Sequence, residues 1–494
     1  MSKLQLVFED ASLTKKERRA YRRQVSAALQ DLTPKEVKDN SNDLPVKMHQ
    51  PPKPGSYFSF GVNRPKHSGT GYQLAAANPF AAAELYESAG PVIGLELQSG
   101  GRPFTFDPHV LYLRGLVTSP NLLVQGSLRR GKSFFVKRLV CLLSMFGRYA
   151  INTSDSKGEH GVVAEALGGQ VIRIGGFGNN VRINPLERGQ RYRNQADAAY
   201  EAMVRSNRRM VLQQIITQIL PNRDDLEPRE KSVLDWALEE EIQRTGDDPT
   251  IRGVWEVLQE VRDRPDLGFE RTDAGPLIDS LRLLVSGELE GMFDGHSTVT
   301  LDPLSPYTVI DTYEMAQRGD LALAITQSVT NAWVQNTIAD KTSGRRYFVI
   351  REEGWRDMNT VSALEAHRLQ LKLSGEYGIT MVMIVHEDGD FDAVGSEGSR
   401  ARELAKGLLK GYANRITFML PQAALKDAVR AGTYSQNEAD MISVLDRGQF
   451  LVKLHSGSYL VDGRPTTTEW ERHLFDTDQA MNSRATESEG PADE

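Results

Sequence analysis

The chain has 494 residues, of which 39% are hydrophobic and 25% charged, so it can form two to four soluble globular domains. Its formal net charge of −7 does not favour a strongly basic nucleic-acid-binding protein, although an acidic chain can still carry a local basic channel. A single cysteine, Cys141, excludes an intrachain disulfide framework, and no apolar run reaches the roughly 18 to 20 residues of a membrane span.

Residues 1–58 are expected to form a basic amphipathic helix followed by a linker. Thr14 and Glu17 have the spacing of a capping box, and an apolar stripe with helical periodicity follows within 12–32. The cations of this helix could dock on an anionic membrane, a nucleic acid or an acidic protein, or they could form a solvated face. Residues 33–55 are rich in Pro, Lys and Asn, which is typical of a linker.

Residues 59–193 are expected to contain a small β region and the first part of a RecA-like α/β core. Residues 90–111 alternate like short strands around a Gly-Gly turn. From residue 121 the pattern becomes strand, loop, helix and strand. Such alternation predicts a mostly parallel sheet with helices on both faces.

The α/β pattern is interrupted at 194–291, where nearly every segment has helical periodicity. We interpret this range as an inserted all-α subdomain. Strand and helix patterns resume over 292–475, which is expected to complete the RecA-like core and to end in a hairpin at 448–463. The polar, acidic residues 476–494 are expected to be disordered.

The motif G-x-x-x-x-G-K-S follows the apolar strand at 121–125 and precedes a helical pattern, which indicates a P-loop for ATP. Polyphosphate binding requires backbone N–H groups that converge in front of a helix N-terminus. Lys132 is expected to reach the β- and γ-phosphates, and Ser133 is expected to bind Mg²⁺. The expected nucleotide-binding residues are Gly126, Ser127, Leu128, Arg129, Arg130, Gly131, Lys132, Ser133 and Phe134.

Arg129 departs from the G-x-x-G-x-G-K-S form of the loop, in which a glycine at this position allows a positive φ. A strained side chain there costs on the order of 1 kcal/mol, which bound phosphate can offset. Arg129 and Arg130 could reach the phosphates, or both could point to solvent.

Hydrolysis of ATP also requires acidic residues at the end of a neighbouring strand. The apolar strand in YFVIREEGW (347–355) ends in Glu352, the candidate Mg²⁺ ligand, and Glu353, the candidate catalytic base. The alternative is two surface glutamates after an edge strand. His386 ends the strand pattern of 379–386 and is expected either to position water near the γ-phosphate or to be structural.

Several further motifs resemble those of the conjugative type IV secretion ATPases. These TraC-like motors are the fourth component of the Vir-type transfer apparatus and belong to the HerA–FtsK branch of P-loop ATPases. The resemblance covers about 90–475 and is carried by SPNLLVQGSLRRGKS (119–133), NTSDSKGEHGVVAEALGG (152–169), INPLE (183–187), GMFDG (291–295), EEGW (352–355) and the ordered run from VHEDGDF through GLL to GQFLVKL.

The resemblance implies a cytoplasmic ATPase, peripheral at the inner face of the cell membrane, that drives DNA or protein transfer. It also implies a homo-hexamer that contacts membrane-embedded secretion or conjugation subunits, with DNA as a further candidate partner. The chain departs from the family pattern at Arg129, at Glu352 in place of Asp, at His386 and at Gly375. Gly375 lies where such motors often carry an Arg, for which Arg351 and Arg415 are the weaker candidate substitutes.

Two alternative functions remain open from the sequence. One is a DNA-translocating motor of the coupling-protein or FtsK type, for which the basic N-terminal helix argues and the net charge argues against. The other is a nucleotide-binding structural or switch subunit with little hydrolysis, which the departures at Arg129, Glu352 and Gly375 favour.

Overall fold

The structure is a computed structural model. It describes residues 90–175, 181–191, 193–220, 223, 225–261, 268–340, 342–352, 358, 360–386, 400–455 and 457–475. The expected N-terminal helix and linker, Glu353 and the acidic tail lie outside the described residues.

One sheet of 11 strands organises the described chain, in the order β2-β1-β11-β10-β9-β3-β8-β7-β4-β6-β5. The strands from β9 to β5 in this order are parallel, and β10, β11, β1 and β2 extend the sheet in antiparallel pairings. The strands are β1 Val92–Glu96, β2 Arg102–Thr105, β3 Leu122–Gln125, β4 Tyr149–Asp155, β5 Gln170–Arg173, β6 Tyr307–Asp311, β7 Tyr347–Glu352, β8 Ile379–Val385, β9 Asn414–Thr417, β10 Gln449–Leu454 and β11 Gly457–Asp462.

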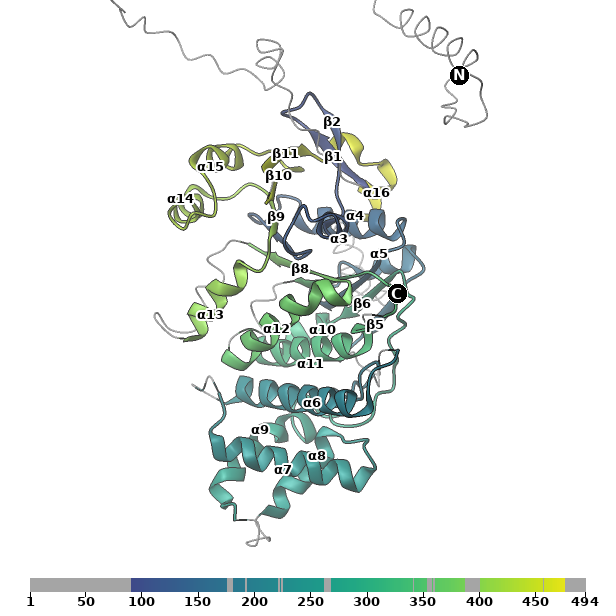
Figure 1. Cartoon of the computed structure of the whole chain (residues 1–494), viewed down its shortest axis with the longest axis vertical. Helices are drawn as coiled ribbons and strands as arrows, with labels where there is room; N and C mark the ends of the chain where they lie inside the picture. Colours follow the sequence, from purple (N-terminus) through teal and green to yellow (C-terminus); the bar gives the residue numbers. More distant parts are fainter. Residues whose placement is uncertain are drawn as a thin grey trace, which may run out of the picture. The chain divides into compact units, whose positions relative to one another are not determined.

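Helices cover both faces of the parallel part of the sheet (Figure 1). The helices are α3 Pro108–Leu113, α4 Lys132–Ser144, α5 Gly161–Ala166, α6 Asp197–Ile219, α7 Pro228–Thr245, α8 Ile251–Glu260, α9 Arg271–Val285, α10 Tyr313–Arg318, α11 Asp320–Ile338, α12 Val361–Tyr377, α13 Arg400–Leu409, α14 Gln422–Arg430, α15 Gln436–Ser443 and α16 Glu469–Phe475, with the 3₁₀ helix η4 at Arg464–Thr466.

Side-chain alternation along β3 shows how the two faces form. Leu122 and Val124 pack with Val136 and Leu139 of α4, whereas Leu123 belongs to the separate cluster that includes α11 and α12. Because successive strand residues point to opposite faces, a strand that is apolar at every position must be buried on both sides. This explains why the first three residues of β3, Leu122 to Val124, form an uninterrupted apolar run.

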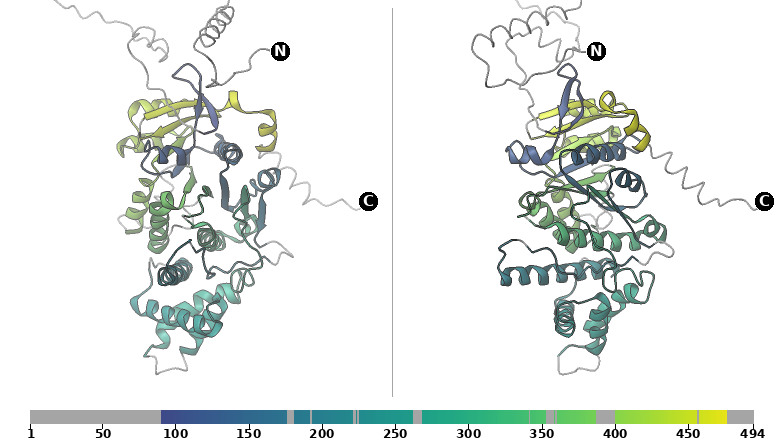
Figure 2. Two further views of the ribbon diagram at one scale, coloured as in Figure 1. Left: turned by 45° about the vertical axis from the view of Figure 1, so that its right-hand side comes forward. Right: turned by 90° about the vertical axis from the view of Figure 1, so that its right-hand side faces the viewer.

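The helical insertion packs on the sheet's α11 and α12 layer. Helix α6 contacts α11 and α12 on one side and α7 and α9 on the other, and both views of Figure 2 show it between them. Helix α8 begins at the N-cap Thr250, whose hydroxyl accepts a hydrogen bond from Gly253 N–H at 3.1 Å. Helices α6 to α9 fall within the range expected for the insertion, 194–291.

The fold class is therefore confirmed as α/β with a mostly parallel sheet. The hairpins β1–β2 and β10–β11 also lie where the sequence placed strands, and Cys141 is buried. Helices α14 and α15, between β9 and β10, were not predicted. Among the residues that the structure describes, no helix is both long and apolar enough to cross a bilayer.

Candidate nucleotide-binding site

The candidate site lies at the carboxyl edge of the parallel strands, where β3, β8 and β7 end side by side. Gln125, the last residue of β3, is in register with Val385 of β8, and Glu352 of β7 is in register with Ile384 of β8. The P-loop therefore begins about two strand spacings, roughly 10 Å, from Glu352. His386 directly follows the intervening strand, so the structure brings these three residues to the same edge of the sheet.

The P-loop backbone adopts positive φ at Gly126 (153°), Arg129 (59°) and Gly131 (105°). An added Cβ on Gly126 would lie 2.6 Å from the Cβ of Phe418, so glycine is required where the loop passes β9. The positive φ at Arg129 confirms the strain expected there.

The Lys132 ammonium is buried and is held inside the loop. It donates hydrogen bonds to the carbonyl oxygens of Gly126 and Ser127, the latter at 3.0 Å, and its Nζ lies 3.2 Å from His386 Nδ1. The His386 carbonyl in turn accepts from Gly126 N–H at 3.1 Å. His386 thus contacts both the backbone and the cation of the P-loop, whereas its role near the γ-phosphate stays a prediction.

The remaining loop residues are accessible. Leu128 is 68% exposed, Arg129 is exposed and Arg130 is half-buried, and neither arginine has an ion pair within the described chain. Ser133 and Phe134 are half-buried in the first turn of α4. The Ser133 hydroxyl has no hydrogen-bond partner among the described residues, so its oxygen is available to a metal ion, and the loop residues fit a bound Mg·nucleotide.

The Glu352 carboxylate is buried and is held by a histidine that the sequence analysis had not singled out. His160 Nε2 lies 2.7 Å from Glu352 Oε1, and His160 Nδ1 lies 2.5 Å from the Tyr307 hydroxyl. Both ring nitrogens of His160 are therefore engaged, Nε2 with the carboxylate and Nδ1 with the tyrosine hydroxyl, and these two contacts fix the ring beside Glu352. The second carboxylate oxygen remains for a metal ion.

Asp155 positions this histidine. Its carboxylate accepts backbone N–H groups from Glu159 at 3.0 Å and His160 at 2.8 Å. Burial raises the pKa of Asp155. Burial would also raise the pKa of Glu352, but the His160 imidazole, with Lys157 and Lys137, holds it below its ordinary value. Glu352 is therefore ionised, as a metal ligand must be.

A second buried chain of hydrogen bonds begins one residue earlier on β7. Arg351 NH1 lies 2.5 Å from His367 Nδ1, and His367 Nε2 lies 2.8 Å from the Tyr412 hydroxyl. Burial, with the nearby Arg351 charge, lowers the pKa of His367 well below its usual value, so this histidine is neutral. Because Arg351 is only 5% exposed, it cannot replace a surface arginine that reaches a neighbouring molecule.

The C-terminal segment closes over α4. The Arg138 guanidinium donates to the carbonyls of Ile93 and Thr466 and pairs with Glu471 at 3.1 Å. The Phe134 ring meets Phe475 edge-on at 5.4 Å between centroids. These contacts fix the helix whose N-terminus faces the P-loop.

The structure therefore brings together the loop, Glu352 and His386, whose roles stay predictions, and it adds His160 and Tyr307, which the sequence analysis had not singled out. Asp155 and Glu159 belong to a motif quoted for the resemblance, whereas a lone tyrosine at the start of β6 gives no sequence signal. Tyr307 is linked to Glu352 through His160, whose two ring nitrogens contact the tyrosine hydroxyl and the carboxylate.

No protein-family profile and no curated protein matches the chain. Among solved structures, VirB4 of Thermoanaerobacter pseudethanolicus is similar with a TM-score of 0.61 and 18% identity, over 79% of this chain and 100% of that chain. The chain has the VirB4 fold. The plasmid coupling protein TrwB in complex with ADP and Mg²⁺ matches less well, with a TM-score of 0.48 and 15% identity over 80% of this chain and 92% of that chain.

Proposed function

We propose that the chain is an ATP-hydrolysing motor of a conjugation or type IV secretion-like apparatus, driving DNA or protein transfer. The observation that carries the proposal is the convergence of Lys132, His386 and Glu352 at one edge of the sheet, within a fold shared over the whole length of a VirB4 structure. In this proposal the chain works as a cytoplasmic homo-hexamer bound peripherally to membrane-embedded subunits.

The residues of the site divide the chemistry among them. Lys132 leaves its two carbonyl partners to neutralise charge on the transferred phosphoryl group. Ser133 and Glu352 hold Mg²⁺, which supplies charge neutralisation at the phosphate oxygens when bound. His386 orients the end of the phosphate chain from β8. Glu353, directly after the candidate metal ligand, accepts the proton of the attacking water.

The deciding experiment measures steady-state ATP hydrolysis and MgATP binding of the full chain over a range of protein concentrations. Lys132→Ala and Glu353→Gln are compared with Arg205→Ala, which removes an exposed arginine of α6 far along the chain from the site. Turnover that rises with assembly, is lost in the first two variants and persists in the third supports the motor.

A different result would identify a switch subunit. The Lys132 ammonium is already satisfied by the loop, and one oxygen of Glu352 is already held by His160. If both contacts persist with nucleotide, MgATP binds without turnover at every concentration, and Lys132→Ala alone abolishes binding. That outcome contradicts the motor.

A further inference from the structure

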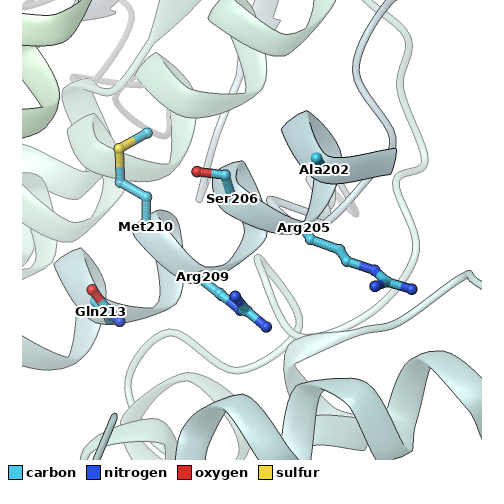
Figure 3. A pocket seen from close by; sticks show the side chains of 6 residues that line it. All are labelled: Ala202, Arg205, Ser206, Arg209, Met210 and Gln213. Carbon is cyan, nitrogen blue, oxygen red and sulfur yellow. The ribbon is translucent and has the colours of Figure 1, made fainter. Parts of the chain in front are cut away.

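Two surface hollows are lined by arginine or lysine side chains. In the first of them, neighbouring carboxylates neutralise these positive charges. The first, of about 440 Å³, runs along α6 and is lined by Ala202, Arg205, Ser206, Arg209, Met210 and Gln213 (Figure 3). Arg205 lies 3.7 Å from Glu239, and Arg209 lies 3.2 Å from Asp235. These carboxylates neutralise the first hollow, so it has no net attraction for an anion.

The second hollow, which we call the cationic pocket, has a volume of about 410 Å³ and is lined by Tyr112, Ser119, Arg368, Lys372, Gly407 and Lys410, among others. No Asp or Glu is among its lining residues. Arg368, Lys372 and Lys410 are exposed, and their side chains have no ion pair or hydrogen bond within the described part of the chain. Three positive charges therefore face one concavity that has no carboxylate among its described lining residues.

Helix ends reduce this charge without cancelling it. The pocket lies at the carboxyl ends of α12 and α13, each of which contributes a partial charge of about −0.5. Three cations and two helix ends leave a net charge of about +2. A surplus of this size matches a group that carries two or more negative charges.

The cationic pocket is separate from the P-loop. Its lining residues Pro120 and Ala413 directly precede Asn121 and β9, at the amino edge of the parallel strands, whereas the P-loop follows the carboxyl edge. The exposed Thr118 and half-buried Ser119 supply hydroxyl groups at the same place. Gly375 allows α12 to pack closely against Tyr112 in the pocket wall, because an added Cβ there would lie 2.8 Å from the Tyr112 ring.

We propose that the cationic pocket binds a small molecule through its pyrophosphate or triphosphate group. The volume suits a compact ligand, the three unpaired cations supply charge-assisted donors, and the hydroxyls supply neutral donors for the remaining oxygens. This binding does not depend on ATP hydrolysis at the P-loop.

The test uses the full chain with Lys132→Ala, so that the P-loop is impaired and the result is independent of the proposed motor. Inorganic pyrophosphate is titrated calorimetrically at low ionic strength without divalent cations. Arg368→Ala, Lys372→Ala and Lys410→Ala are each expected to weaken binding about fivefold, the equivalent of an exposed charge pair of about 1 kcal/mol. Arg205→Ala is the matched control, because its charge is already paired.

Gly407→Glu provides a variant that should fold. An added Cβ at this position of α13 meets nothing within 4 Å, and glutamate is a better helix former than glycine. The new carboxylate is expected to abolish pyrophosphate binding. Guanidinium titration of the same variant should show an unfolding midpoint no lower than that of its parent.

Two outcomes would overturn the proposal. Pyrophosphate affinity that is the same in all four pocket variants would place the ligand elsewhere. If a mixed-sequence single-stranded oligonucleotide, and not pyrophosphate, loses affinity in these variants, the cations serve a nucleic acid backbone and the assignment to a small molecule is wrong.

Discussion

Positively charged side chains have contrasting environments at the two edges of the parallel sheet. At the carboxyl edge Lys132 is buried and has carbonyl partners, and the neighbouring Glu352 is fixed by His160. At the amino edge Arg368, Lys372 and Lys410 are exposed and have no ion-pair partner among the residues that the structure describes. A group that must stabilise a transition state needs its geometry fixed in advance, whereas a group that only captures an anion does not. Substitutions should therefore have larger effects at the carboxyl edge.

The largest effect is expected for Lys132→Ala, which removes the cation from the phosphate-binding loop. We expect ATP turnover to fall by about 10²-fold or more, because fixed charges at developing negative charge contribute most to catalysis. Steady-state phosphate release measures this, with Arg205→Ala as the control. A loss of turnover below about threefold would show that Lys132 does not take part in the reaction. The predicted difference between the two edges of the sheet would then be wrong.

His160→Ala tests whether Glu352 depends on its positioning residue. We expect kcat to fall about 10- to 100-fold and the half-saturating Mg²⁺ concentration to rise, because an unsupported ligand binds metal less well. His160→Gln retains a hydrogen-bond donor, so its kcat and its half-saturating Mg²⁺ concentration should both lie between those of the wild type and His160→Ala. An unchanged Mg²⁺ dependence in a variant with reduced kcat would indicate a purely structural role.

The free energy of unfolding should depend on pH through His109 of α3. The ring is 1% exposed, and neither nitrogen has a hydrogen-bond partner within the described ranges. Burial, with the charges of Arg346 and Arg148 opposed by Asp107, lowers the pKa of His109 to about 4. Between pH 6.5 and 4 the unfolded chain binds a proton that the folded chain does not, so stability falls as the pH falls. We expect a contribution of about 3 kcal/mol over this range, of which about 2 kcal/mol falls between pH 7 and pH 5.

Denaturant titrations at pH 7 and pH 5 measure this dependence. His109→Leu should flatten it, although His367 contributes in the same direction because its pKa is also lowered, so some slope will remain. An unaltered slope in His109→Leu would show that the ring is protonated or solvated in the folded state.

The smallest effect is expected at Arg129. Glycine relieves the strain of a positive φ but adds freedom to the unfolded chain, and the two effects nearly cancel, so Arg129→Gly should change the unfolding free energy by about 0.5 kcal/mol or less. MgATP affinity should change by no more than about twofold, because the side chain is exposed. Arg129→Ala keeps the strain and removes the charge; a large affinity loss in both variants would show that Arg129 reaches the phosphates.

Features of the structure that depend on one continuous stretch of the chain could be predicted from the sequence. The P-loop, the acid at the end of β7 and the helical insertion each leave a continuous signature in the chain, and each lies where the sequence placed it. The site around His160 and Tyr307 and the cationic pocket are each assembled from segments far apart in sequence, which only the tertiary fold brings together. The unpredicted α14 is short and lies on a small separate cluster around Leu425 and Leu451, so its periodicity had little length in which to appear.

The pairing of β1 with β11 has a consequence for how the protein is made. Leu95 near the start of the described chain is in register with Asp462 near its end. During synthesis β1 and β2 emerge early, but their edge has no partner until β11 leaves the ribosome. The nascent chain therefore carries an open strand edge for most of its translation, and such edges pair readily with other chains. Expression of fragments that stop before β11 should favour aggregation, and completion of the hairpin should coincide with solubility.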